Sequence, residues 1–178
     1  MSSSTKQTIM ASFIKLAAKK PLEKITVRDI VDDCGINRNT FYYHFQDIFA
    51  VLEEICAQAI ARIDTTLPFG DMIAEFFLVL AEYTERHPKA VEHFAASIGQ
   101  RGTERYFAKP LDKIIFDVIA TQAPDATSEM QRTTTVFLRH AIIGLYLDFI
   151  SYRGKIDQNG LATRLGLLAN SLLTSLQR

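Results

Sequence analysis

The sequence has little of what marks a secreted or membrane-bound chain. Its two cysteines, Cys34 and Cys56, are too few for a disulfide framework and lack the spacing of a metal site. Both fall inside apolar helical patterns and are expected to be small core residues. The longest apolar run, residues 141–147, is far too short to span a bilayer, and no N-terminal run resembles a signal peptide. We therefore expect a cytoplasmic protein with no membrane segment.

Catalytic signatures are missing as well. The chain has no glycine-rich phosphate loop, no zinc-type His-Glu-x-x-His and no nucleophile elbow. Asp32 and Asp33 point in different directions on a helix, so they make no acid–base pair. His87 and His93 flank a predicted helix start, but no cysteine or acid completes a metal-binding spacing. We expect no enzymatic activity, no cofactor and no metal; the alternatives are a helical-bundle enzyme or small-molecule binder without DNA binding, and a protein-binding scaffold.

The formal net charge is zero, but the charges are unevenly distributed along the chain. Residues 1–46 hold seven Lys or Arg and four Asp or Glu, a balance of +3, which leaves −3 for the remainder of the neutral chain. A modestly positive N-terminal segment attached to a modestly negative body suits a protein that binds DNA in a salt-sensitive way.

Residues 26–45 predict two short helices joined by a tight turn. Thr26 and Asp29 have the spacing of a capping box at the start of the first helix. Gly35 suits the left-handed position that ends this helix, and Asn37 is a good cap for a second helix over about 38–45. Small polar residues come first in the second helix and aromatic residues follow. This layout is typical of a helix-turn-helix, whose second helix meets base edges in the major groove.

Side-chain spacing separates the core face of the second helix from its other faces. Phe41 and Phe45 lie four residues apart and are expected to face the core together. A simpler interpretation takes Asn37 as a cap only and the remaining rings as a solvated face. Taken together with the two caps and the glycine turn, the pattern favours DNA reading. The candidate contacts are Thr26, Asn37, Arg38, Asn39, Thr40, Tyr42, Tyr43 and His44.

The pattern T-V-R-D-I-V-x-x-C-G-I-x-x-x-T-F-Y-Y-H-F resembles the DNA-binding domain of the TetR family of bacterial transcriptional regulators, over about residues 5–50. The closing segment, with Gly144-Leu145-Tyr146, is also similar to regulators of dihydroxyacetone-kinase operons. The resemblance implies an all-α fold of about nine helices. It implies a helix-turn-helix DNA-binding domain over 1–46 and a helical effector-binding and dimerisation domain over 47–178.

The resemblance also assigns roles within the candidate contacts. Thr26 is expected to touch a phosphate, as are the side chains at positions 40, 42 and 44, while the positions most able to reach bases are 37, 38 and 39. The chemistry agrees, because Arg can bridge guanine O6 and N7 and Asn can pair with adenine N6 and N7. One departure stands out: the family usually places a Lys three residues after the His-Phe pair, and here that residue is Ile48. One expected phosphate contact is therefore either absent or supplied by another residue.

The remainder of the chain predicts helices nearly throughout, over about 5–20, 47–65, 71–86, 88–98, 103–121, 128–152 and 158–176. Residues 67–70 are predicted as a break and 99–102 as a loop. The last two helices carry wide apolar faces, which favours a four-helix homodimer interface and hence a roughly palindromic DNA site. The expected interface residues are Phe137, Ile143, Tyr146, Leu161, Leu165, Leu168 and Leu172.

Aromatic and polar side chains of the body could line an effector pocket, or they could form an ordinary aromatic core. The candidates are Phe77, Tyr83, His87, Phe94, Tyr106, Phe116, Phe137 and His140. The resemblance thus implies a homodimeric regulator that binds a palindromic operator in double-stranded DNA and responds to a small molecule. Repression is the expected sign, with activation as the alternative, because nothing in a DNA-reading helix reveals the sign of regulation.

Overall fold

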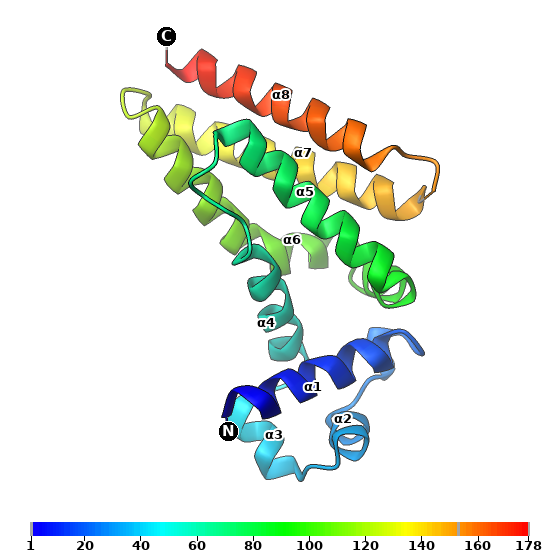
Figure 1. Cartoon of the computed structure of the whole chain (residues 1–178). Coiled ribbons are helices and arrows are strands. Elements are labelled where there is room, and N and C mark those ends of the chain that lie inside the picture. Colours follow the sequence, from blue (N-terminus) through cyan, green and yellow to red (C-terminus); the bar gives the residue numbers. More distant parts are fainter. Residues whose placement is uncertain (1, 153, 178) are drawn as a thin grey trace. The chain divides into compact units, whose positions relative to one another are not determined.

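The computed structural model describes residues 2–152 and 154–177, and side chains in these ranges except those of residues 2, 3, 98–107 and 109. Figure 1 shows helices and no strand in these ranges, which confirms the all-α prediction. The elements are α1 (Ser2–Ala17), η1 (Leu22–Lys24), α2 (Val27–Cys34), α3 (Arg38–His44), α4 (Ile48–Ile60), α5 (Phe69–Arg86), α6 (Pro88–Gln122), α7 (Ser128–Ser151) and α8 (Gln158–Leu176). None of the described helices is long and apolar enough to cross a membrane.

The middle of the chain departs from the sequence-based expectation. The predicted loop over 99–102 was wrong, because the backbone there is part of the continuous helix α6. A glycine in a helix interior costs about 1 kcal/mol, which the helical residues on both sides outweigh. The predicted break over 67–70 is shorter than expected, because α5 already begins at Phe69. Pro68 directly precedes α5, where a missing N–H costs the helix nothing.

Contacts between Cα atoms divide the chain into two compact units, each described by itself. The N-terminal unit consists of Met1–Gln58 and Thr84–Tyr106, and the C-terminal unit consists of Ala59–Tyr83 and Phe107–Arg178. Besides residues 1–46, the N-terminal unit thus contains most of α4, the end of α5 and the first half of α6.

In the N-terminal unit, α2 packs against both α1 and α3. The core of this unit includes Ile9, Ile30 and Phe41, whose side chains are completely buried. The Phe41 and Phe45 ring centroids lie 6.1 Å apart, and both rings are buried, which confirms their predicted place in the core. These apolar contacts fix α3 against the unit and leave its other faces exposed.

The C-terminal unit has an aromatic core, in which Phe77 packs edge-on against Phe149 with ring centroids 5.9 Å apart. The helices α7 and α8 lie side by side (Figure 1). The start of α5 approaches the α8 backbone closely: the Gly70 N–H donates to Asn170 Oδ1 over 2.7 Å. A Cβ atom added to Gly166 would lie 2.6 Å from the Gly70 carbonyl oxygen, so this crossing requires glycine.

Candidate nucleic-acid interface

A complete capping box starts α2. The Thr26 hydroxyl accepts from the Asp29 N–H over 3.2 Å, and the Thr26 N–H donates to Asp29 Oδ2 over 2.8 Å. The Thr26 hydroxyl also donates to Asp29 Oδ2 over 2.7 Å. Gly35 ends the helix in the left-handed conformation, with φ at 67°. The predicted caps of α2 are confirmed, and a phosphate at Thr26 must compete with Asp29 for the hydroxyl proton.

Lys20 completes this cluster through an ion pair with Asp29, Nζ to Oδ2, of 2.8 Å. The Lys20 ammonium, followed by the Thr26 donors, lowers the pKa of Asp29 from 3.8 to about 2. The carboxylate therefore stays charged at every physiological pH and holds the α2 start in place. Sequence reasoning missed Lys20, because no local spacing links it to Asp29.

The cap of α3 limits what Asn37 can offer to DNA. Its Oδ1 accepts from the Thr40 N–H over 2.8 Å and from the Thr40 hydroxyl over 3.0 Å. A paired contact to adenine needs both the amide oxygen and the amide nitrogen. While Asn37 caps α3, its amide nitrogen alone is available, so of the predicted base-reaching positions 37–39 it is the least suited to a paired base contact.

The outer face of α3 is open to solvent and carries the other predicted contacts. Arg38 and Asn39 are exposed, and the exposed fractions of Tyr42 and Tyr43 are 55% and 81%. His44 is half-buried, and the Tyr43 ring meets the His44 ring edge-on with centroids 5.0 Å apart. The structure thus places the predicted DNA-binding residues on the α2 start and on α3, within one unit.

The start of α4 offers no cation in the place where the resemblance leads one to expect it. The Ala50 N–H donates to Asp47 Oδ1 over 2.8 Å, so a carboxylate caps this helix, as predicted. Ile48 follows and is half-buried. An aspartate cap repels a phosphate, so the start of α4 is a less favourable phosphate site than a lysine there would make it.

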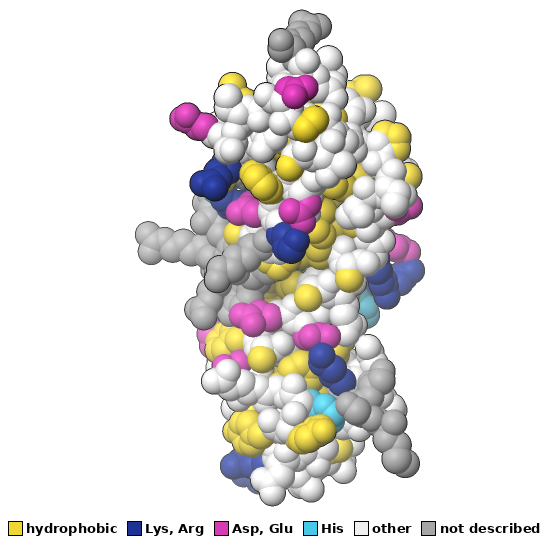
Figure 2. Space-filling view, turned by 90° about the vertical axis from the view of Figure 1, so that its left-hand side faces the viewer, with side chains coloured by type: hydrophobic (Ala, Val, Ile, Leu, Met, Phe, Trp, Pro, Cys, Tyr) yellow, Lys and Arg dark blue, Asp and Glu magenta, His cyan; other side chains and the backbone are white. Residues whose placement is uncertain are grey.

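Most basic side chains of the first 46 residues are paired with acids. The ion pairs are Lys6–Glu54 (2.8 Å), Lys15–Asp33 (2.6 Å), Lys20–Asp29 (2.8 Å) and Arg28–Asp32 (3.5 Å). Across the described part of this segment, Lys19, Lys24 and Arg38 make no ion pair. Figure 2 shows basic and acidic side chains interspersed on one face of the molecule. Of the three unpaired cations, Arg38 is the one on α3.

The predicted effector residues are divided between the two units. In the C-terminal unit, Phe77 belongs to the core, Tyr83 and Phe116 are half-buried, and Phe137 and His140 are exposed on α7. His87 and Phe94 are half-buried residues of the N-terminal unit, which also contains Tyr106, whose side chain lies outside the described residues. Neither unit by itself brings the whole predicted set together.

The predicted dimer residues separate into buried and accessible ones. Ile143, Tyr146 and Leu165 are buried in the core of their own protomer, and Leu161 and Leu172 are half-buried. Phe137 and Leu168 are exposed at 59% and 64%. The exposed apolar side chains of α7 and α8 therefore include these two, together with Val136 and Leu167.

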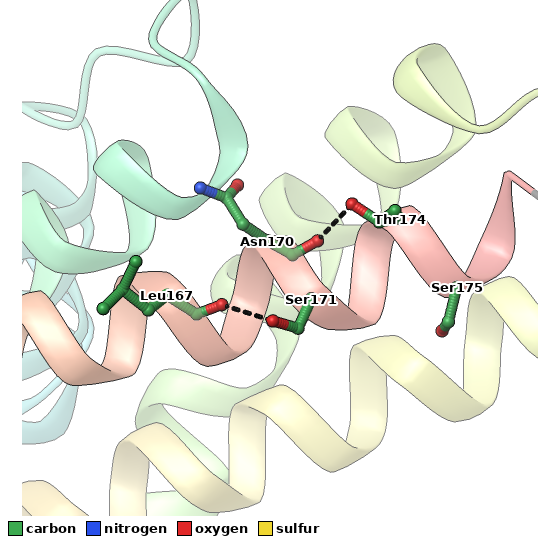
Figure 3. A pocket seen from close by; sticks show the side chains of 5 residues that line it. All are labelled: Leu167, Asn170, Ser171, Thr174 and Ser175. Atoms are coloured by element: carbon green, nitrogen blue, oxygen red, sulfur yellow. Dashed lines mark hydrogen bonds between the residues drawn. The ribbon is translucent and has the colours of Figure 1, made fainter.

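An open groove of about 380 Å³ lies along α8 and is lined by Leu167, Asn170, Ser171, Thr174 and Ser175. Figure 3 shows that the Ser171 and Thr174 hydroxyls donate to the backbone of their own helix, to the carbonyl oxygens of residues 167 and 170. Because these hydroxyls are already bonded, the groove has few free polar groups for a ligand.

The two cysteine thiols are not activated for chemistry. Burial raises the pKa of the Cys56 thiol to about 12, and burial also raises the pKa of Cys34. Neither thiol is therefore a thiolate at neutral pH. Among the residues that the structure describes, no group of three or more His, Cys, Asp or Glu side chains is placed to hold a metal ion.

Sequence comparison finds similarity to known proteins in the N-terminal segment. Residues 9–55 match the sequence profile of a family described as bacterial regulatory proteins, tetR family. The chain is similar to the HTH-type transcriptional regulator YerO of Bacillus subtilis (strain 168), with 37% identity over 51 residues. That match covers 29% of this chain and only 18% of YerO.

Structural comparison extends the likeness of fold to nearly the whole chain. The dihydroxyacetone kinase operon activator DhaS matches with a TM-score of 0.67 and 20% identity, over 97% of this chain and 96% of DhaS. A TetR transcriptional regulator from Streptococcus agalactiae 2603V matches with a TM-score of 0.63 and 18% identity, over 99% and 96% of the two chains. NalD of Pseudomonas aeruginosa matches with a TM-score of 0.58 and 17% identity, over 92% of each chain.

Proposed function

We propose that this chain is a DNA-binding transcriptional regulator that acts through α2 and α3; the match of residues 9–55 to the sequence profile of the tetR family supports this. The observation that carries the proposal is the exposed face of α3. It presents Arg38 without an ion pair beside the exposed Asn39, at the start of a helix whose inner face is locked into the core. Such an arrangement suits insertion into a major groove.

The operator follows from the proposed oligomeric state. Exposed apolar side chains of α7 and α8, Phe137 and Leu168 among them, support a homodimer formed through these helices. Two identical α3 helices related by a twofold axis read a palindrome whose half-sites lie about one DNA turn apart. The helix-turn-helix of one protomer has few free cations and binds DNA weakly, and the two copies in a dimer together raise the affinity.

The regulator is proposed to repress its genes and to be released by a small molecule bound in the C-terminal unit. One structural neighbour, NalD, is described as the secondary repressor of a multidrug efflux pump. A specific observation also favours activation as the second candidate, because DhaS, which shares the fold over nearly the whole chain, is described as an operon activator. A reporter gene placed behind the selected operator, with and without the protein, separates the two.

The experiment that tests the function is selection of bound sequences from a random duplex pool at two salt concentrations. We expect one palindrome to be enriched, with an affinity that falls as the salt concentration rises. Arg38→Ala is the informative variant, because it removes the unpaired cation of α3. A matched control is Arg28→Ala, whose cation is already paired with Asp32. Absence of any enriched sequence for the wild-type protein contradicts the proposed function.

A further inference from the structure

The first half of α6 belongs to the N-terminal unit and makes polar contacts to residues 17–25, which we call the α1–η1 corner. His93 Nδ1 lies 2.7 Å from the Ala17 carbonyl oxygen. Ser97 Oγ accepts from the Leu22 N–H over 3.2 Å and donates to Glu23 Oε2 over 3.1 Å. More than 70 residues of sequence separate these partners, so the contacts are tertiary.

Both contacts satisfy backbone groups that helix ends leave without a partner. Ala17 is the last residue of α1, and the carbonyls of a last helical turn have no intrahelical donor. A carbonyl oxygen only accepts, so His93 donates its Nδ1–H. The Leu22 N–H is the first of η1, and Pro21 before it has no N–H to offer. His93 thus closes the end of α1, and Ser97 caps the start of η1.

The α1–η1 corner is in turn connected to the start of α2. Lys20 lies within the corner and forms the 2.8 Å ion pair with Asp29. Asp29 holds the N–H and the hydroxyl of Thr26, the cap of α2. The backbone of residues 17–23 therefore joins the polar contacts made by α6 to the Lys20–Asp29 ion pair at the start of α2.

We propose that His93 and Ser97 are positioning residues for DNA binding, which fix the α1–η1 corner and through it the orientation of α2 relative to α1. This inference rests on the proposed function, since it concerns how the same DNA-binding surface is held. When one of these caps is lost, the corner can adopt other conformations. The fraction of the protein in the conformation that binds DNA then falls. The roles differ from those of the exposed α3 residues, because His93 and Ser97 contact residues of the α1–η1 corner.

The test uses the full-length chain and the operator duplex that the wild-type protein selects. His93→Ala and Ser97→Ala each remove one set of hydrogen bonds. One lost hydrogen bond shifts the equilibrium between the held and the released corner by about fivefold, so operator binding is expected to weaken by up to about fivefold per protomer. Ser97→Ala is also expected to speed hydrogen exchange of the Leu22 amide, which loses its acceptor. Ala96→Ser is the matched control, an exposed neighbour on the same helix, and should bind as the wild-type protein does.

Conservative variants separate positioning from simple loss of fold. The Asn amide places a nitrogen where His has Nδ1, and Thr keeps the hydroxyl, so His93→Asn and Ser97→Thr are expected to restore binding to within about twofold of wild type. Wild-type affinity in both alanine variants, or failure of both conservative variants to restore binding, overturns the inference. Failure of the wild-type protein to select any duplex instead overturns the proposed function, while exchange at Leu22 still reports on the Ser97 cap.

Discussion

In the C-terminal unit, where α5 approaches α8 closely, Gly→Ala substitutions at two positions are expected to change the free energy of unfolding in opposite directions. Gly166 and Gly144 both lie inside long helices, where Gly→Ala is worth about 1 kcal/mol in favour of the helix. Their surroundings differ. A Cβ at Gly166 would stand 2.6 Å from the Gly70 carbonyl oxygen and 3.3 Å from Ala74 Cβ. A Cβ at Gly144 would meet nothing within 4 Å.

Gly166→Ala is therefore expected to lower the free energy of unfolding. The obstructing atom is backbone, so the start of α5 must move away, and overpacking of this kind costs about 1–3 kcal/mol. The movement also stretches the 2.7 Å hydrogen bond from the Gly70 N–H to Asn170, whose loss costs about 1 kcal/mol more. After subtraction of the helix-propensity gain, the net loss is about 1–3 kcal/mol.

The measurement is urea unfolding followed by circular dichroism, at one fixed protein concentration because the stability of the proposed dimer depends on it. Gly144→Ala is the matched control and is expected to raise the free energy of unfolding by up to about 1 kcal/mol. A Gly166→Ala protein as stable as wild type, or more stable, refutes the close crossing of α5 and α8.

Three further predictions concern the candidate nucleic-acid interface. Ile48→Lys adds a cation at the start of α4, so a dimer's plot of log affinity against log salt should steepen by about 1.8; an unchanged slope argues against a phosphate near this helix. By NMR titration Asp29 should show a pKa of about 2, and Lys20→Met should raise this pKa toward 3.8. Because the pKa is lower in the folded state, the contribution of Asp29 to the free energy of unfolding is complete above about pH 4 and is lost as the pH falls toward 2. In competition binding, Asn37→Ser should keep the sequence preference, whereas Asn39→Ala should lose about 1–3 kcal/mol of discrimination at one base pair per half-site; equal effects of the two contradict the capping argument.

Local features of the fold could be predicted from the sequence because their partners are close along the chain. The capping box of Thr26, the caps at Asn37 and Asp47, and the left-handed Gly35 each join residues at most four apart, and all were confirmed. The amphipathic pattern that buries Phe41 is equally local.

Tertiary contacts could not be predicted, because nothing in a single sequence fixes which distant polar groups meet. Lys20 reaches Asp29 only after the chain has turned through η1. The amides and carbonyls that His93 and Asn170 satisfy lie on helices that are remote in sequence. The continuity of α6 also escaped prediction, since two glycines within four residues are typical of a loop and their cost is outweighed only by the surrounding helix.

Under the proposed function, the charges of the first 46 residues favour a dimer as the form that binds DNA. Lys6, Lys15, Lys20 and Arg28 are engaged by acids, so within the described part of the first 46 residues three cations per protomer are free to neutralise phosphates. Even if all three did so in both protomers, log affinity would fall with log salt with a slope of about −5. One protomer has half of that electrostatic contribution. This favours a DNA site that is bound well only when the α3 helices of both protomers contact it. Sequence preference, rather than charge, must then supply most of the discrimination between the operator and other DNA.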